Sequence, residues 1–260
     1  MTTSARIILD SVSQSGYRLV TMQLVYPRFI HSEFMTHRVF SRNAASSRAI
    51  PVAKMIEQVR TNPATPIHWG ANQPGMQART EIADVQGALD LWNVAAQSAA
   101  LSAEMMADLG LHKQVANRIL EPFQWMHTIV SSTEWTNFFA LRRHPDADPN
   151  IHLLADCMNE AMKLSVPTLR DWHMPYIADS DNDKMDLRDM CMISAARCAR
   201  VSYLNHDGSA PNAAKDLVLA GQLMTSGHWS PFEHVAQAKL GIAMNANYRS
   251  WQSYRHTKGM

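Results

Sequence analysis

The sequence predicts an α+β protein in which an antiparallel sheet is combined with a large helical portion. Residues 5–12 and 17–26 are rich in Ile, Leu and Val, and the turn residues at 13–16 between them predict a β-hairpin. Residues 82–109 form a long stretch rich in Ala, Leu and Met, which predicts a helix that ends at Gly110. Mostly helix with a few strands is typical of the α+β class.

The other elements expected from the sequence are mainly helices. Their approximate bounds are 52–60, 112–120, 135–143, 151–164, 190–202 and 213–225. A further strand is expected at 235–244. The stretch 62–77, rich in Pro, Gly and Asn, is long for a plain connection and is interpreted as an ordered functional loop. We expect one domain over 1–260, in which the acidic, turn-rich segment 179–189 is the best candidate for a boundary.

Composition and charge indicate a folded, cytoplasmic protein. The 260 residues are 46% hydrophobic and 18% charged, which is typical of a globular chain and not of a disordered one. With 24 Lys and Arg against 23 Asp and Glu, the net charge of +1 provides no field for gripping nucleic acid. No run approaches the roughly 18 apolar residues that a membrane-spanning helix needs, and the first residues lack the pattern of a signal peptide.

The three cysteines, Cys157, Cys191 and Cys198, form no Cys-x-x-Cys pair. An odd number of cysteines in a chain of this length indicates reduced thiols packed as small apolar groups. A zinc site would need several ligands at suitable spacing, and none is evident around His228 and His234, so no bound metal is expected.

The segment 36–48 concentrates hydrogen-bond donors, with three Arg, one His and three Ser in thirteen positions. A guanidinium offers a planar fork to a phosphate, and hydroxyl and backbone N–H groups complete the shell of donors. Composition alone also allows a solvated basic face. Apolar residues at Phe40, Ala44 and Ala45 interleave with the donors, which favours a half-buried segment whose charges need an anionic ligand.

This segment resembles the signature of the flavin-dependent thymidylate synthases, which reads Arg-His-Arg, seven residues, then Ser. Thr36 stands in place of the first Arg. The residues that fall where the family places the same type are His37, Arg38, Asn43, Ser46 and Arg48.

Two further parts of the chain resemble the same family. Residues 137–142, Asn-Phe-Phe-Ala-Leu-Arg, with the Ala-Asp and Ile of 147–151, are similar to its later helix. Residues 199–203, Ala-Arg-Val-Ser-Tyr, and 226–234, Ser-Gly-His-Trp-Ser-Pro-Phe-Glu-His, are similar to its opening pair of motifs. In the family this pair precedes the Arg-His-Arg signature, whereas here it follows. The order indicates the family's fold in circularly permuted form, with the junction expected near 179–189.

The resemblance implies a chemistry. Members methylate dUMP at C5 to give dTMP, with the carbon from methylenetetrahydrofolate and reducing equivalents from NADPH through FAD. They are homotetramers whose active sites are shared between subunits. We therefore expect FAD as cofactor, NADPH and methylenetetrahydrofolate as co-substrates, and a pyrimidine deoxynucleoside monophosphate as substrate of a homotetramer, with neither nucleic acid nor membrane as partner.

The resemblance also implies roles for individual residues. Arg142 is expected beside the pyrimidine as the catalytic residue, because a fixed guanidinium stabilises negative charge that develops on the ring. The residues expected to bind the nucleotide are Glu33, Ala45, Ser46, Ser47, Arg48 and Arg142. The residues expected around the flavin are His37, Arg38, Val39, Asn43, Asn137, Ser202, His228, Ser230, Glu233, Asn247 and Arg249. Without the family pattern, Arg142 would be an ordinary helix-face ion-pair partner worth about 0–1 kcal/mol.

Departures from the pattern put the substrate in doubt. Glu33 stands where the family usually has Gln, and a carboxylate accepts well from the exocyclic amine that cytosine has and uracil lacks. Ser131 and Thr133 align with a family Asn-x-Arg pair, for which Asn247 and Arg249 are the suggested replacements.

Three alternatives therefore accompany the methylation of dUMP. They are transfer to dCMP, a 5-hydroxymethyl product formed when water rather than hydride ends the reaction, and a non-catalytic nucleotide-binding protein that keeps the fold. Arg255 and His256 are suggested to replace the guanidinium lost at Thr36. No cysteine has the surroundings of an activated nucleophile, and flavin-dependent members need none.

Overall fold

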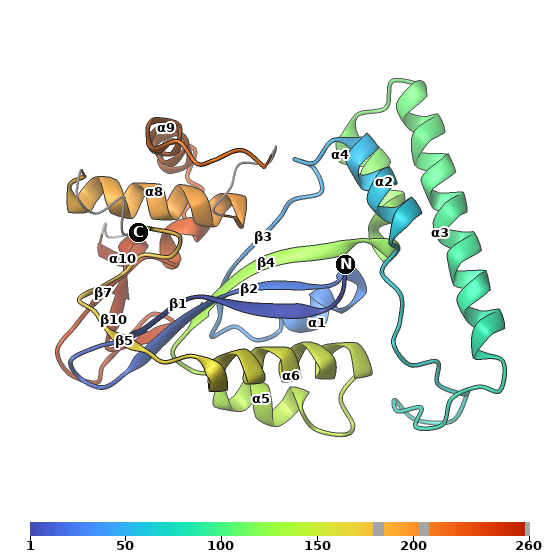
Figure 1. The fold of residues 1–260 in the computed structure, drawn as a ribbon, viewed down its shortest axis with the longest axis horizontal. Helices are drawn as coiled ribbons and strands as arrows, with labels where there is room; N and C mark the ends of the chain where they lie inside the picture. The colour runs from blue at the N-terminus through green and yellow to red at the C-terminus, as the bar shows by residue number, and fades with distance from the viewer. Residues whose placement is uncertain (179–184, 203–207, 258–260) are drawn as a thin grey trace.

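The predicted hairpin forms the middle of a five-stranded sheet. In the computed structural model, which describes residues 1–178, 185–202 and 208–257, the strands pair in the order β3-β4-β2-β1-β5 (Figure 1). Every neighbouring pair in this sheet is antiparallel except β1 with β5. The strands are β1 (Ser4–Val12), β2 (Arg18–Pro27), β3 (Ser41–Ala44), β4 (Trp125–Ser132) and β5 (Thr168–Leu169). The expected α+β class with an antiparallel sheet is confirmed.

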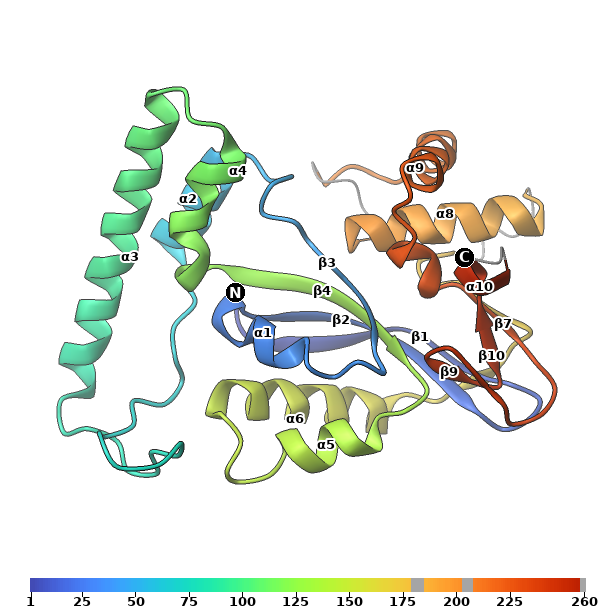
Figure 2. The ribbon, with the colours of Figure 1, turned by 180° about the vertical axis from the view of Figure 1, so that it is seen from behind.

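Helices cover both faces of this sheet. α5 (Thr136–Arg142) and α6 (Pro149–Leu164) lie on one face, and α8 (Leu187–Arg200) lies on the other (Figures 1 and 2). Side chains of β2 alternate between the faces, as the two-residue period of a strand requires. Four residues of β2 enter the same hydrophobic core as α5 and α6, and each is worth roughly 1.5–3 kcal/mol on full burial; they are Val20, Met22, Leu24 and Tyr26.

The C-terminal part of the chain carries two small sheets beside α8. One has the strand order β10-β7-β6, and the other is the hairpin β8-β9. The strands are β6 (Trp172–His173), β7 (Ala236–Ala238), β8 (Met244–Asn245), β9 (Tyr248–Arg249) and β10 (Trp251–Ser253). The helices are α9 (Ala213–Thr225), η3 (Ser230–Glu233) and α10 (Tyr254–Thr257). The strand expected at 235–244 is wrong beyond Ala238, because Gly241 takes a φ of +91° and redirects the chain into β8.

A helical arm stands at one side of the sheet (Figure 1). Its elements are α2 (Val52–Thr61), α3 (Val85–Asp108), α4 (Lys113–Ala116) and η2 (Asn117–Phe123). α3 packs in the arm's hydrophobic core through Trp92 and through four small side chains, which let the helix approach α2 and η2 closely: Ala96, Ala99, Ala100 and Ala103. Gly110 follows α3 with a φ of +81°, as expected of a helix stop. The single helix expected at 112–120 is wrong, since α4 passes into a 3-10 turn that contains Pro122.

The other expected helices are confirmed to within a few residues at each end. Of the proposed boundary at 179–189, residues 179–184 lie outside the described part of the chain, and 187–189 begin α8. The structure also contains β3 and β4, for which the sequence analysis has no expectation. β4 is buried on both faces over most of its length, so its sequence lacks the alternation that marks an amphipathic strand.

Candidate active site

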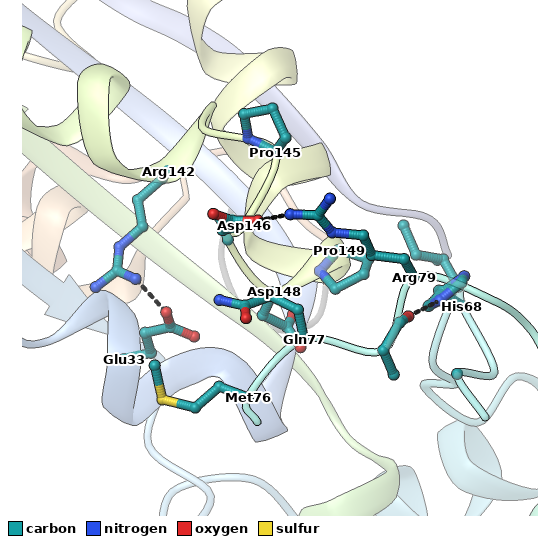
Figure 3. A pocket seen from close by; sticks show the side chains of 14 residues that line it. Glu33, His68, Met76, Gln77, Arg79, Arg142, Pro145, Asp146, Asp148 and Pro149 are labelled. Atoms are coloured by element: carbon teal, nitrogen blue, oxygen red, sulfur yellow. Dashed lines mark hydrogen bonds and ion pairs between the residues drawn. The ribbon is translucent and has the colours of Figure 1, made fainter. Parts of the chain in front are cut away.

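Arg142, the last residue of α5, is held by a short segment that follows β2. Its Nη1 forms an ion pair with Oε1 of Glu33, and its Nε donates to Nε2 of His37 over 2.8 Å. Thr36 Oγ1 lies 3.5 Å from Nη2. Figure 3 shows Arg142 and Glu33 pointing toward each other across the opening of a cavity. Contacts on three sides of the guanidinium fix its orientation before any ligand arrives.

His37 accepts from Arg142 because it is neutral. Burial, with the nearby guanidinium groups of Arg142 and Arg42, lowers the pKa of His37 to about 4. At neutral pH Nε2 therefore carries a lone pair, and the proton is on Nδ1. The imidazole stands edge-on to Phe138, with ring centroids 4.8 Å apart. The aromatic core under α5 thus fixes the imidazole of His37, which in turn orients Arg142.

The cavity beside this cluster, the Arg142 cavity, has a volume of about 700 Å³. One wall comes from the loop before α3, which the sequence analysis interprets as functional. The loop is tied to the connection between α5 and α6, where Arg79 Nη2 lies 2.8 Å from Oδ1 of Asp146 (Figure 3). Within the loop, His68 Nε2 lies 2.6 Å from the carbonyl oxygen of Ala78. The polar side chains around the cavity are Glu33, His68, Gln77, Arg79, Arg142, Asp146 and Asp148.

A second cavity, the Asn43 cavity, has a volume of about 510 Å³ and lies where β3 meets the end of α8 and η3. Ser230 Oγ donates to Oδ1 of Asn43 over 3.1 Å, although 187 positions separate the two residues. The Nδ2 of Asn43 donates to the carbonyls of Cys198 and Ala199 at 3.1 and 3.3 Å. The predicted site residues that line this cavity are Asn43, Ala45, Ser46, Ser202, His228 and Ser230.

A third cavity of about 330 Å³, the Glu233 cavity, lies at the hairpin β8-β9. Its lining includes Glu233, Asn247, Arg255 and His256. Arg255 forms an ion pair with Glu233 at 2.5 Å, and Asn247 Nδ2 lies 3.4 Å from Oγ of Ser41 on β3. Arg255, which was suggested to replace the guanidinium missing at Thr36, therefore forms an ion pair with Glu233.

The hairpin brings Arg249 to the end of β4. The backbone N–H of Arg249 donates to Oγ1 of Thr133 over 3.0 Å, and its Nε donates to Oε1 of Glu134 over 2.9 Å. Arg249 therefore lies beside one of the two positions whose family residues it was suggested to replace. Ser131, the other position, is fully buried and bonds to Thr21 Oγ1 at 2.5 Å and His234 Nδ1 at 2.8 Å, so it faces the interior.

Comparison with known proteins identifies the family of the chain that forms these cavities. The model of the thymidylate synthase complementing protein family matches residues 18–168, which is more than half of the chain. The chain belongs to this family. The sequence resemblance to the flavin-dependent thymidylate synthases is thereby confirmed. The matched region contains β2, β3 and β4 with Glu33, His37 and Arg142, whereas β1 precedes it. The motifs at 199–203 and 226–234 follow it, as a permuted order requires.

Three solved structures resemble the chain at low sequence identity. The UMP/dUMP methylase PolB from Streptomyces cacaoi bound with 5-Br UMP is 15% identical, with a TM-score of 0.51 over 62% of this chain and 88% of that chain. PolB bound with 5-Br dUMP is 18% identical, with a TM-score of 0.48 over 56% of this chain and 66% of that chain, just under two thirds of it. Thymidylate Synthase X (ThyX) from Helicobacter pylori with FAD and dUMP is 14% identical, with a TM-score of 0.41 over 55% and 67%. No curated protein sequence matches the chain.

Family membership implies FAD, and the residues around the Asn43 cavity fit such a group. FAD has a pyrophosphate that needs donors and a ring system that needs both hydrogen-bonding and apolar surface. The lining offers Asn43, Ser46, Ser202, Ser230 and His228 next to apolar residues, and no Asp or Glu is among the described residues that form it. The donor set and the missing negative charge suit a dianionic dinucleotide.

Several predicted site residues line none of the three cavities described above. Arg38, Val39, Arg48 and Asn137 are exposed on the surface. Ser47 is buried, and its backbone carbonyl accepts from Nδ2 of Asn117. Arg142 and Ser46 line different cavities. The chain thus gathers the predicted residues in separate groups.

The structure also identifies site residues that the sequence analysis missed. Gln77 and Arg79 line the Arg142 cavity, and Arg200 lines the Asn43 cavity. Arg200 belongs to the family motif Ala-Arg-Val-Ser at 199–202, which marks it as a residue of interest. The motif alone does not indicate that Arg200 lines a cavity. Among the residues with described positions, no group of three His, Cys, Asp or Glu side chains could hold a metal ion. The helices in the same part of the chain include none that is long and apolar enough to cross a membrane.

Proposed function

We propose that the protein transfers a one-carbon unit to C5 of a pyrimidine deoxynucleoside monophosphate, converting dUMP to dTMP. Methylenetetrahydrofolate would supply the carbon, and NADPH the reducing equivalents. The observation that carries the proposal is the Arg142 cluster, because a guanidinium oriented by Glu33 and His37 opens onto a cavity large enough for a nucleotide. Family membership of this region supports the same assignment.

Arg142 supplies the electrostatic part of the chemistry. Attack of a pyrimidine C5 on an electrophilic carbon requires negative charge on the ring, which a cation beside the carbonyl oxygens stabilises. Because His37 is neutral, it does not offset the positive charge of Arg142. The ion pair with Glu33 holds the guanidinium of Arg142 in the cavity wall. The nucleotide must compete with Glu33 for the guanidinium or share it, so the base is bound next to a carboxylate.

FAD, when bound, supplies hydride for the reduction that completes the methyl group. We propose that Asn43, Ser202, His228 and Ser230 hold it, with Glu233, Asn247 and Arg249 near the beginning of the same strand, β3. The contacts that support this are Ser230 to Asn43 at 3.1 Å and Asn247 to Ser41 at 3.4 Å, which place both groups of residues against the same strand.

We propose that the active site is completed between protomers of a homotetramer. Arg38 and Arg48 are exposed and line none of the three cavities described above, and Ser46 lines a different cavity from Arg142. A second protomer that presents its phosphate-binding segment to the Arg142 cavity would bring these residues together. The molar mass of the protein in solution by light scattering measures this directly.

The visible absorption spectrum of the purified protein tests the proposed function. A yellow protein with flavin bands that shift on addition of dUMP, and that releases dTMP with labelled methylenetetrahydrofolate and NADPH, is the expected result. A colourless protein that takes up no added FAD would instead identify a nucleotide-binding relative without catalysis.

A second candidate substrate is dCMP. Glu33 lies in the wall of the Arg142 cavity, where its carboxylate can accept from the exocyclic amine of cytosine. Assays with dUMP and dCMP side by side, with the product identified as methyl or 5-hydroxymethyl, decide between the two bases and the two products.

A further inference from the structure

Arg200, the last residue of α8, is a buried cation in the wall of the Asn43 cavity. Its side chain is only 9% exposed. Its Nη1 bonds to Oδ1 of Asp216 at 2.5 Å, and the other oxygen of that fully buried carboxylate accepts from Nε of Arg197 at 3.0 Å. The single charge of Asp216 is therefore shared between two guanidinium groups.

Two further nitrogens of Arg200 have no acceptor in the described part of the chain. Both Nε and Nη2 are buried, and neither has a hydrogen-bond partner among the residues that the structure describes. A buried donor left without an acceptor is unfavourable, and the penalty is larger for a charged group. Such donors in native proteins call for an explanation, and a bound ligand is one of the usual ones.

The two nitrogens form one edge of the guanidinium, and the same edge is used elsewhere in this chain. In Arg18, Nε and Nη2 donate to the two oxygens of Asp10 at 2.8 and 2.6 Å. Two parallel donors of this kind match the oxygens of a carboxylate or a phosphate. In Arg200 no described residue accepts from this edge, so its geometry indicates an anion with two adjacent oxygens.

The cavity around Arg200 favours negative charge. The described residues of its lining include no Asp or Glu, and they offer the hydroxyl groups of Ser46 and Ser230 and the imidazole of His228. Because the Nε–Nη2 edge is buried, the ligand's oxygens must replace the atoms that now cover it. The volume of about 510 Å³ leaves room for a larger molecule to which a phosphate group is attached.

We propose that Arg200 binds a phosphate group in the Asn43 cavity through its Nε–Nη2 edge. The inference rests on the proposed function, which provides two sources of that group: the pyrophosphate of FAD and the monophosphate of the substrate. The shared chemistry is a phosphate that accepts two hydrogen bonds from one guanidinium, with nearby hydroxyl groups completing its shell.

The test begins with inorganic pyrophosphate as the probe and the full-length protein. Calorimetric titration of wild type should give saturable binding. Arg200→Lys keeps a cation for Asp216 but loses the two-nitrogen edge, and its affinity should fall by about tenfold to a hundredfold, as expected for charge-assisted hydrogen bonds. Arg60→Lys is the matched control, since Arg60 also places two nitrogens on a carboxylate, that of Glu104, but lines none of the three cavities described above. Equal affinity in wild type and Arg200→Lys would overturn the proposal.

A second variant keeps the test decisive if Arg200→Lys fails to fold. Ala49→Glu adds a carboxylate at an exposed position in the lining of the same cavity without touching Asp216. It should also lower pyrophosphate affinity at least tenfold, and unchanged affinity would count against the phosphate site.

Paired ligands then identify the source of the phosphate. If Arg200→Lys weakens FAD but not riboflavin, the pyrophosphate of the cofactor lies at Arg200; if it weakens dUMP but not deoxyuridine, the substrate phosphate does. Pyrophosphate binding that depends on Arg200 in a protein that takes up neither FAD nor dUMP would retain the anion site and reject the proposed function.

Discussion

Nε of Arg142 donates to Nε2 of His37 over 2.8 Å, so the orientation of the proposed catalytic guanidinium depends on a neutral imidazole. The pKa of His37 is lowered from its ordinary value near 6.5 to about 4. The ring is therefore neutral and able to accept at pH 7, and it loses that ability as the pH falls through about 4. Protonation would place two cations in contact.

Replacement of His37 tests whether this contact positions Arg142. His37→Phe keeps a ring against Phe138 but removes the acceptor, and affinity for dUMP should fall by about tenfold or more. In wild type, dUMP affinity should hold from pH 8 to 5 and decline below, whereas the variant should lack that acid limb. The control is His152→Asn on α6, which does not line the Arg142 cavity. A folded His37→Phe protein with wild-type affinity and kcat would refute the positioning role.

Exchange of Glu33 for the residue that the family usually has at this position tests base selection. Glu33→Gln replaces an acceptor-only carboxylate with an amide that can also donate, which suits the carbonyl oxygen of uracil. The ratio of kcat/KM for dUMP to that for dCMP should rise at least tenfold. Parallel assays with both nucleotides measure it, and Glu121→Gln on η2 serves as a control outside the cavity. A ratio that does not move would show that Glu33 does not read the base.

Two buried histidines make the fold sensitive to acid. Thr21 Oγ1 bonds to His173 Nε2 at 2.7 Å and to Ser131, which in turn contacts His234 at 2.8 Å. Burial lowers the pKa of both imidazoles to about 3. The unfolded chain takes up these protons near pH 6.5 and the folded chain does not, so stability is full above pH 6.5 and falls as the pH drops toward 3.

The expected slope is about 1.4 kcal/mol per pH unit for each histidine over that interval. Urea unfolding at pH 7.5 and 5.0 measures the free energy of unfolding. His173→Gln should remove about half of the acid sensitivity of the pair, at the cost of lower stability at pH 7.5. If the free energy of unfolding changes equally with pH in wild type and variant, His173 does not cause the acid sensitivity.

Removal of the cysteines should leave catalysis largely intact. Cys191 and Cys198 are fully buried, and Cys157 is partly buried. Burial raises the pKa values of the Cys157 and Cys198 thiols, which disfavours the thiolate that a nucleophile needs. A Cys157→Ser/Cys191→Ala/Cys198→Ala protein should turn over dUMP near the wild-type rate and lose about 1 kcal/mol of stability per buried site. A triple variant that binds FAD but is inactive would contradict the flavin-dependent route.

The sequence predicts the hairpin and the long helices because their patterns are local. The strand pair at 5–12 and 17–26 is joined by a short turn, and each helix repeats its apolar residues with a helical period. β4 escapes prediction because it lies in the centre of the sheet, where both faces are buried. The assembly of the site is not local either. Ser230 reaches Asn43 across 187 positions, and no spacing rule predicts that contact.

The family signatures compensate for this limit only in part. They single out Arg142 and Glu33, which the structure brings into contact. They do not reveal Arg200, whose significance lies in two nitrogens without acceptors in the described structure, nor the loop residues Gln77 and Arg79. A motif specifies residue types, whereas burial and hydrogen bonding emerge only after the chain has packed.

The contact between Arg249 and the end of β4 leads to a final prediction on FAD. We expect Asn247 and Arg249 to replace the flavin contacts that Ser131 and Thr133 cannot make. Arg249→Ala should weaken FAD by about tenfold, because a charged hydrogen-bond donor is lost, and should leave dUMP affinity unchanged. Glu134→Gln weakens the partner of Arg249 without removing the guanidinium, so FAD affinity should fall less. Fluorescence titration of FAD measures both effects. If Arg249→Ala binds FAD as tightly as wild type, the hairpin serves only to close the fold against β4, and the missing contacts must come from another protomer.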